Sequence, residues 1–295
     1  MSRTQNTARK STVKMIRSRP ATPISHHRNV VGGVMSFVWL AIVALPLYWI
    51  VLTSFQSQSG FFVGGPLSFP AEPTLDNYRL VLENDFWRYL GNSAFVTVAA
   101  TTFIVALGFL AAYAITRNGR GVAKTTFTVL LLGLAIPLQA TIIPVYLMIV
   151  QLGLYDTLWG IVLPSVAFGL PITVLILVNF LRDVPRSLFE SARIDGATEW
   201  QAMTKIALPL SRPALVTVAI YSGIIVWNGF LFPLILTQSE DKRVLPLALT
   251  TYQGMFTINV PAVIAAVVMS SIPVIALYIF GRRQLLAGMT AGFGK

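Results

Sequence analysis

Six long stretches of this chain carry no charged residue, and this constrains its fold more than any other feature. Only 11% of the 295 residues are charged, against roughly 25% in soluble proteins. Each stretch contains an apolar run of about 20 residues, the length that a helix needs to cross a bilayer. A soluble globular fold is therefore excluded. The stretches are Asn29–Ala71, Tyr89–Thr116, Thr125–Tyr155, Thr157–Leu181, Pro213–Ser239 and Val244–Gly281.

The apolar runs predict an all-α polytopic membrane protein with six transmembrane helices. We expect the spans at 31–54, 91–115, 126–149, 158–181, 213–237 and 261–281. The remaining segments are a basic cytoplasmic N-terminal tail (1–30), an external loop (55–90) and a cytoplasmic C-terminal tail (282–295). A polar hairpin (183–212) lies within the core 91–281.

Lysine and arginine residues predict that both termini lie in the cytoplasm, because cytoplasmic segments of membrane proteins are enriched in them. With this orientation, 18 of the 22 basic residues lie on the cytoplasmic side, and the other four are Arg79, Arg88, Lys242 and Arg243. The net charge of +11 is then an orientation signal, and no nucleic-acid partner is expected. The first 28 residues resemble a transit peptide in composition. We favour a disordered cytosolic tail whose basic residues help to hold the N-terminus inside. Pro20 and Pro23 also oppose the continuous amphipathic helix of a transit peptide.

The sequence offers little for catalysis by this chain. It has no cysteine, which excludes disulfides and thiol chemistry. Its two histidines lie in the tail, and no carboxylate pair lies within a span, so neither a metal site nor an enzyme is expected. The segment Gly119–Thr125 is no phosphate loop, because Ala123 stands where a glycine must precede the lysine. We therefore expect no cofactor on this chain.

The polar hairpin at 183–212 has strong local folding signals. Ser187 with Glu190, and Thr198 with Gln201, have the spacing of helix capping boxes. Gly196 stands where a left-handed helix stop needs a residue without Cβ. The hairpin is thus predicted to contain a helix over 188–194 and a second helix that ends at Pro209. Its many apolar side chains must pack on the spans, on each other or on a partner.

The hairpin motif resembles the EAA loop of binding-protein-dependent ABC importer permeases, with Ser191 where that family usually has alanine. Further segments are similar to the carbohydrate branch, in particular to the six-helix subunit of the maltose-type permease pair. The hairpin residues that carry the resemblance are Glu190, Ala192, Asp195, Gly196, Ala197, Ile206, Leu208, Pro209 and Pro213, and the further segments are Pro73–Tyr78, Tyr89–Ser93 and Arg282–Gly292.

The resemblance implies a type I importer transmembrane domain in a bacterial plasma membrane. The implied partners are membrane lipid, a second homologous permease, an extracytoplasmic sugar-binding protein, and a dimer of ABC ATPases that binds ATP and magnesium. The implied substrate is a carbohydrate, in particular an oligosaccharide. The alternative is a stand-alone secondary transporter with the hairpin as a connector, although ion coupling usually needs ionisable residues within spans. The implied ATPase-coupling residues are Glu190, Ala192, Asp195, Gly196, Ala197, Leu208 and Pro209.

Polar and aromatic residues at mid-span depth are candidates for a solute path, because sugar rings present both C–H patches and hydroxyls. Each of them has an alternative role in an interhelical hydrogen bond or in packing. Prolines within the spans are expected to kink the helices, and the small pair Gly108 and Ala112 is expected to serve close packing. The path candidates are Tyr221, Trp227, Asn228, Gln139, Thr141, Asn179, Ser270 and Ser271.

Overall fold

The computed structural model describes residues 30–64, 69–117, 121–252 and 259–291. The chain divides into two compact units, residues 1–45 and 46–295. The described part of the first unit belongs to helix α1 (Val30–Ser54), which continues into the second unit. Its 25 residues are long enough to span a bilayer. All buried side chains of α1, Thr53 and Ser54, lie in the second unit.

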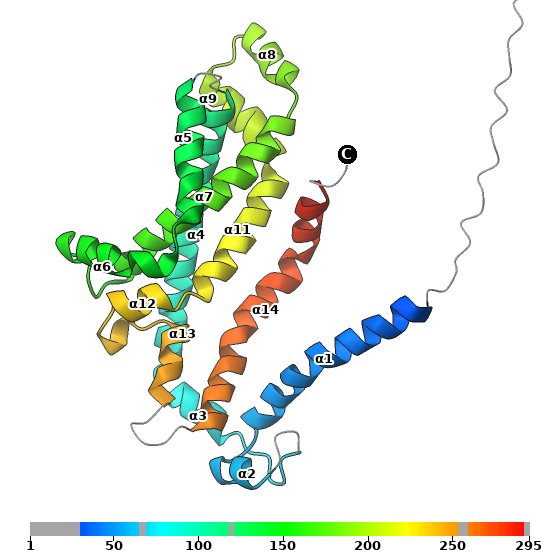
Figure 1. Cartoon of the computed structure of the whole chain (residues 1–295), viewed down its shortest axis with the longest axis vertical. Helices are drawn as coiled ribbons and strands as arrows, with labels where there is room; N and C mark the ends of the chain where they lie inside the picture. Colours follow the sequence, from blue (N-terminus) through cyan, green and yellow to red (C-terminus); the bar gives the residue numbers. More distant parts are fainter. Residues whose placement is uncertain (1–29, 65–68, 118–120, 253–258, 292–295) are drawn as a thin grey trace, which may run out of the picture. The chain divides into compact units, whose positions relative to one another are not determined.

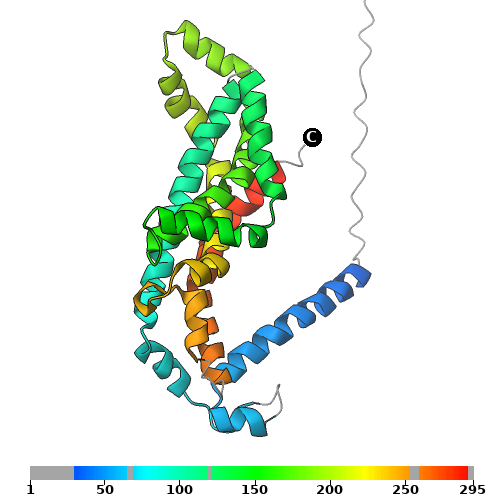
Figure 2. The same cartoon turned by 60° about the vertical axis from the view of Figure 1, so that its left-hand side comes forward.

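A bundle of long helices forms the centre of the second unit: α4 (Phe86–Arg117), α7 (Leu158–Asp183), α11 (Arg212–Trp227) and α14 (Val260–Ala291). Helices α7 and α11 pack on α4, and α14 packs on α11 (Figures 1 and 2). Small residues bring α4 and α7 close together, since a Cβ on Gly108 would lie 2.5 Å from Cγ2 of Thr173. Ala112 is fully buried. Close packing at these two positions is therefore confirmed.

The expected span at 126–149 is a broken helix. Helix α5 (Gly121–Leu132) continues through the 3₁₀ turn η1 (Gly133–Ala135), and the chain resumes with η2 (Leu138–Thr141) and α6 (Ile142–Gln151). The two halves are bent by 99°. Pro137 causes the break, because it donates no backbone hydrogen bond and forces the residue before it towards extended backbone. Ile136 accordingly has φ −83° and ψ 116°.

The expected span at 213–237 is also interrupted. Helix α11 ends at Trp227, and a separate short helix, α12 (Leu231–Leu236), follows the break. At the break, both the backbone nitrogen and the Nδ2 atom of Asn228 donate to the carbonyl of Ile224, at 3.1 and 2.8 Å. The amide side chain thus competes for a helix carbonyl, and Gly229 adds conformational freedom that weakens continuation of the helix.

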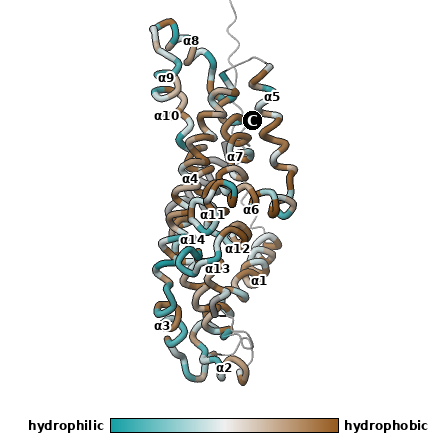
Figure 3. The backbone as a smooth tube through the Cα atoms, turned by 90° about the vertical axis from the view of Figure 1, so that its left-hand side faces the viewer, coloured by the Kyte–Doolittle hydropathy of each residue, from teal (hydrophilic) through white to brown (hydrophobic). Residues whose placement is uncertain are grey.

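Four described helices are long and apolar enough to cross a membrane, or six if each of two bent pairs counts as one span. One pair is the broken helix at Pro137, and the other joins Glu199–Leu210 to Arg212–Trp227 with a bend of 72°, so it lies before α11 and not at the break after it. Helices α1 and α7 match their predicted spans closely, whereas α4 begins earlier, at Phe86, and α14 continues to Ala291. Most residues along α5 and α7 are hydrophobic, whereas α3 (Asp76–Glu83) has many hydrophilic residues (Figure 3). The result confirms the predicted all-α membrane fold.

Side-chain hydrogen bonds connect the loops at one end of the bundle. This is the end that the basic residues predict to be external. Asn92 of α4 donates to the carbonyls of Asp241 and Arg243, both at 2.8 Å. Asp156 accepts from the backbone nitrogens of Gln238 and Ser239, at 2.8 and 2.9 Å. These bonds order the loop after α12. The smaller elements of this end are α2 (Gln58–Val63), η4 (Glu240–Lys242), α13 (Leu245–Ala248) and η5 (Leu249–Tyr252).

Candidate functional site

The polar hairpin forms as a pair of short helices. Its first arm is α8 (Arg186–Ile194), and its second arm joins α9 (Glu199–Ala202), the π turn η3 (Met203–Ala207) and α10 (Leu208–Leu210). Gly196 has φ +80°, which confirms the left-handed stop. The capping box at Thr198 is also confirmed, because its hydroxyl accepts from the backbone of Gln201 while the Gln201 side chain accepts from the backbone of Thr198.

Two details of the predicted hairpin are wrong. Ser187 does not cap the first helix, because α8 begins earlier, at Arg186, with Pro185 at the N-cap and no side-chain bond there. The second arm does not stop at Pro209 but continues to Leu210. The π turn Met203–Ala207 before Pro209 explains this. In a π turn each backbone nitrogen donates to the carbonyl five residues earlier instead of four, so the regular α-helical pattern is already interrupted where the proline enters.

The hairpin is fixed to the end of α4. Phe189 of α8 is 2% exposed, and the guanidinium carbon of Arg117 lies 3.7 Å from its ring centroid. The Tyr113 hydroxyl donates to Oε2 of Glu199 at 3.1 Å, and Arg193 Nε donates to Oε1 of Glu199 at 2.9 Å. Buried and charged contacts therefore hold both arms of the hairpin to one membrane helix, α4.

The outer surface of the hairpin combines charged and apolar side chains. Ile194 is 86% exposed and Trp200 is 66% exposed. Removing these large apolar side chains from water would be favourable, so their exposure is unusual. Among the expected coupling residues, Ala192 and Ala197 are half-buried and the others are exposed. An exposed apolar patch beside charges is typical of a protein interaction site. The exposed coupling residues are Glu190, Asp195, Gly196, Leu208 and Pro209.

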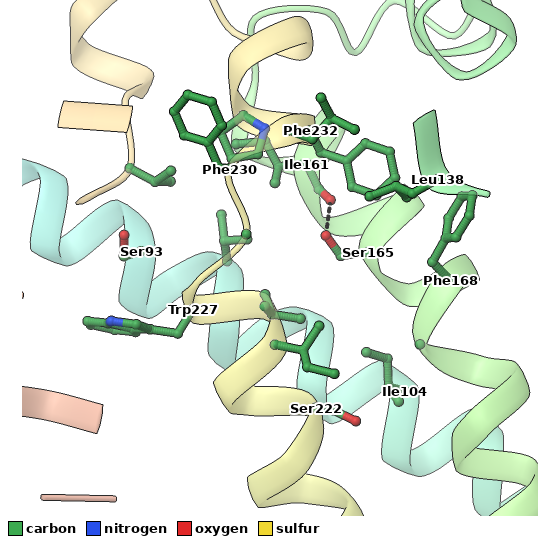
Figure 4. Close-up of a pocket in the computed structure, with 18 of the residues that line it drawn as sticks. Ser93, Ile104, Leu138, Ile161, Ser165, Phe168, Ser222, Trp227, Phe230 and Phe232 are labelled. Carbon is green, nitrogen blue, oxygen red and sulfur yellow. Dashed lines mark hydrogen bonds between the residues drawn. The ribbon is translucent and has the colours of Figure 1, made fainter. Parts of the chain in front are cut away.

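A cavity of about 350 Å³ lies inside the bundle, between α4, α7, α11 and α12 (Figure 4). Both helix breaks border it, since Leu134 and Leu138 flank one break and Gly229 and Phe230 form part of the other. The hydroxyl of Ser222 is buried there without a hydrogen-bond partner among the described residues. A broken helix in a membrane is tolerated where it borders protein or a water-filled cavity.

The structure brings only Tyr221 and Trp227, of the eight path candidates, into the cavity wall. The Trp227 indole donates to the carbonyl of Ser270 at 3.3 Å, which ties it to α14. Asn228 bonds to its own helix, and Gln139 and Asn179 are exposed outside the wall. The hydroxyls of Thr141, Ser270 and Ser271 each donate to a nearby carbonyl of their own segment.

Sequence reasoning missed several wall residues. Ser165 donates to the carbonyl of Ile161 at 2.7 Å, and Phe168 and Phe232 stand beside it (Figure 4). The available signal was the combination of Gly229 and Pro233, because a glycine and a proline within five residues of a span predict a broken helix. Aromatic residues next to such a break are candidates for the wall of a cavity.

Comparisons with known proteins agree with this geometry. The family model described as "Binding-protein-dependent transport system inner membrane component" matches residues 104–284. The diacetylchitobiose uptake system permease protein NgcG of Streptomyces coelicolor is 31% identical over 278 residues, covering 93% of this chain and 92% of its own. The trehalose transport system permease protein SugB of Mycobacterium tuberculosis is 32% identical over 271 residues, covering 91% and 98%.

A solved structure shares the fold. A chain of a bacterial ABC transporter involved in the import of the acidic polysaccharide alginate superposes with a TM-score of 0.76 and 25% identity, covering 89% of this chain and 99% of its own. The matched family and the relatives identify the class of this protein as a permease of a binding-protein-dependent importer, and its membrane helices agree with that class. The chain belongs to the family of binding-protein-dependent transport system inner membrane components.

Proposed function

We propose that this chain is one of two permease subunits of an ATP-driven importer that carries an oligosaccharide across a bacterial plasma membrane. The hairpin carries this proposal, because it exposes Ile194 and Trp200 beside charged side chains while α4 holds it from behind. The relatives named for diacetylchitobiose and trehalose support the substrate class. The extracytoplasmic binding protein delivers the sugar to the outer loops.

In this proposal, two partner ATPases bind ATP and magnesium, close on each other and move the hairpin as a lever. The coupling residues in this proposal are Glu190, Ala192, Asp195, Gly196, Ala197, Leu208 and Pro209. The helices then alternate between two packings, which nucleotide binding favours differently. The interiors of the described spans carry no Asp, Glu, Lys, Arg or His. This supports ATP rather than an ion gradient as the energy source of transport.

Affinity purification of the tagged chain from its native host in mild detergent, with mass spectrometry, tests this proposal. We expect a second permease and an ATPase with a phosphate loop to accompany the chain, and sugar uptake to require both. Recovery of the folded chain alone, together with uptake driven by protons or sodium, would instead identify a secondary transporter. A Trp200→Glu variant sharpens the test, because it should release the ATPase while the second permease stays bound.

A further inference from the structure

A second cavity, of about 440 Å³, lies at the base of the hairpin between the ends of α4, α5 and α7 and the start of α8. Four cations line it: Arg117, Lys124, Arg182 and Arg186. No described aspartate or glutamate belongs to its wall. The orientation predicted from the basic residues places this cavity at the cytoplasmic surface of the membrane.

The two guanidinium groups in this cavity that contact aromatic rings lack a carboxylate partner. Arg117 stacks on Phe189, and the guanidinium carbon of Arg182 lies 5.3 Å from the ring centroid of Phe127. Neither forms an ion pair with a described carboxylate. Glu199 is within electrostatic range of Arg117, but it is bonded to Arg193 and Tyr113. Stacking uses the faces of a guanidinium and leaves its N–H edges free for an anion.

The rest of the cavity suits an amphiphilic ligand. Ile115, Phe127 and Leu181 form an apolar part of its wall. Beside it, α5 has no buried residue and exposes Val122 and Val129. The wall also includes Ala123 and Lys124 of the first turn of α5, where amide groups without a helical partner favour a negative charge. A phosphate among the four cations would place an acyl chain along the outer side of α5.

We infer that this cavity binds the phosphate headgroup of an anionic phospholipid from the cytoplasmic leaflet. Basic pockets between membrane helices on this side suit such headgroups. The lipid bridges α5 to the base of α8, since Arg186 is the first residue of α8 and Arg117 contacts Phe189. A bound headgroup therefore steadies the hairpin on the membrane surface. The binding of lipid is independent of which solute the protein carries.

Native mass spectrometry of the purified full-length chain, with the subunits that accompany it, tests the site. The probes are phosphatidylglycerol and, as a neutral lipid, phosphatidylcholine. The variant K124Q/R186Q removes two cavity cations that stack on no ring. The matched control K205Q/R212Q removes two exposed cations of the hairpin and of α11 that lie outside the wall. Both variants remove the same charge from the same side of the membrane.

Each cation that contacts the headgroup of an anionic lipid contributes about fivefold to its binding, and cations outside the cavity wall do not reach the bound headgroup. We therefore expect K124Q/R186Q to bind phosphatidylglycerol about 30-fold more weakly, while K205Q/R212Q and phosphatidylcholine binding stay unchanged. Equal weakening in both double variants would overturn the site in favour of general surface attraction. Displacement of the lipid by millimolar inorganic phosphate would assign the cavity to a soluble anion. Sugar uptake is measured separately, so that loss of transport is distinguishable from loss of lipid.

Discussion

At the scale of single residues, Gly196 and Gly153 are the two described glycines with left-handed backbone, at φ +80° and +68°. A Cβ at either position would meet open space, so substitution there is costly only through the backbone. An L-residue in this conformation costs about 1–2 kcal/mol. The two glycines therefore form a matched pair, one at the tip of the hairpin and one between α6 and α7.

Gly196→Val should uncouple sugar uptake from ATP hydrolysis, because the strained turn moves Glu190 and Ala197 relative to each other. Membrane insertion should stay intact, since the residue has no packing neighbour. Uptake and ATPase activity of the reconstituted transporter measure the effect. Gly153→Val carries the same strain away from the hairpin and should stay coupled. Normal coupled uptake by Gly196→Val would refute the role of the hairpin as a lever.

Asp156 joins the loop before α7 to the loop after α12 through three hydrogen bonds. The bond from the Ser239 hydroxyl is the main reason that the pKa of this carboxyl lies below its ordinary value, and the two backbone bonds add to it. A depressed pKa in the folded state means stability that is present at neutral pH and lost as the pH falls through that pKa.

Asp156→Asn should therefore lower stability by about 1 kcal/mol or less at pH 7, because the amide oxygen can still accept hydrogen bonds but lacks the charge that strengthens them, and solvent screens that charge at this accessible site. The stability gap to the wild type should begin to narrow below the ordinary aspartate pKa of about 4, and it should close only once the pH has fallen below the depressed pKa of the folded state. Thermal unfolding in detergent at both pH values measures this. Asp85→Asn is the control, because Asp85 and Asp156 both have left-handed backbone, with φ of 55° and 58°. The Asp85 carboxylate, however, forms only an exposed ion pair. An equal loss of stability in Asp156→Asn and Asp85→Asn would contradict the role of the Asp156 hydrogen bonds and would assign the loss to the left-handed backbone that both residues share.

At the scale of elements, the contact between α4 and α7 determines the bundle. Gly108 faces Thr173, and Ile104 fills the space above Gly169, where a Cβ would lie 2.5 Å from Ile104 Cδ1. Such small residues let two membrane helices approach closely, because dispersion and not the hydrophobic effect drives their association in lipid. The hairpin packs on the same core, since Phe189 of α8 lies in one buried cluster with Leu177 and Val178 of α7.

Gly108→Ala should destabilise the bundle by about 1–3 kcal/mol, because its methyl group would overlap Cγ2 of Thr173. Adding Thr173→Ser removes that methyl group and should restore most of the loss. Gly91→Ala is the control on the same helix. Its Cβ meets nothing within 4 Å, and alanine is the better helix former, so its melting temperature should not fall. Failure of Thr173→Ser to rescue Gly108→Ala would contradict the assigned contact.

At the scale of the whole molecule, the cavity of about 350 Å³ joins both broken spans to the bundle core. Helix breaks leave backbone carbonyls without helical partners, and a passing sugar offers hydroxyls to such groups. The unpartnered hydroxyl of Ser222 is a further hydrogen-bonding group in this wall. We propose this cavity as the position of the solute path through this subunit.

Ser222→Leu should block sugar uptake by filling the cavity, whereas Ser222→Ala, which removes only the hydroxyl, should lower uptake by about tenfold or less. Proteoliposome uptake with the assembled transporter separates the two. The melting temperature of Ser222→Leu should fall, since Ser222 is only 3% exposed and the larger side chain must displace its neighbours. Uptake is therefore compared only at temperatures at which both variants stay folded. Full uptake by a folded Ser222→Leu protein would exclude this cavity from the path.

The sequence by itself determined what depends on local chemistry: the apolar spans, the left-handed stop at Gly196 and the capping box at Thr198. Span length follows bilayer thickness, and these turn signals act within a few residues. Only the tertiary structure decided that the Trp227 indole bonds to α14 while Ser222 lines the cavity in the bundle, and that Arg117 and Arg186 line one cavity at the hairpin base. These outcomes depend on contacts between residues far apart in the chain, which no local pattern encodes.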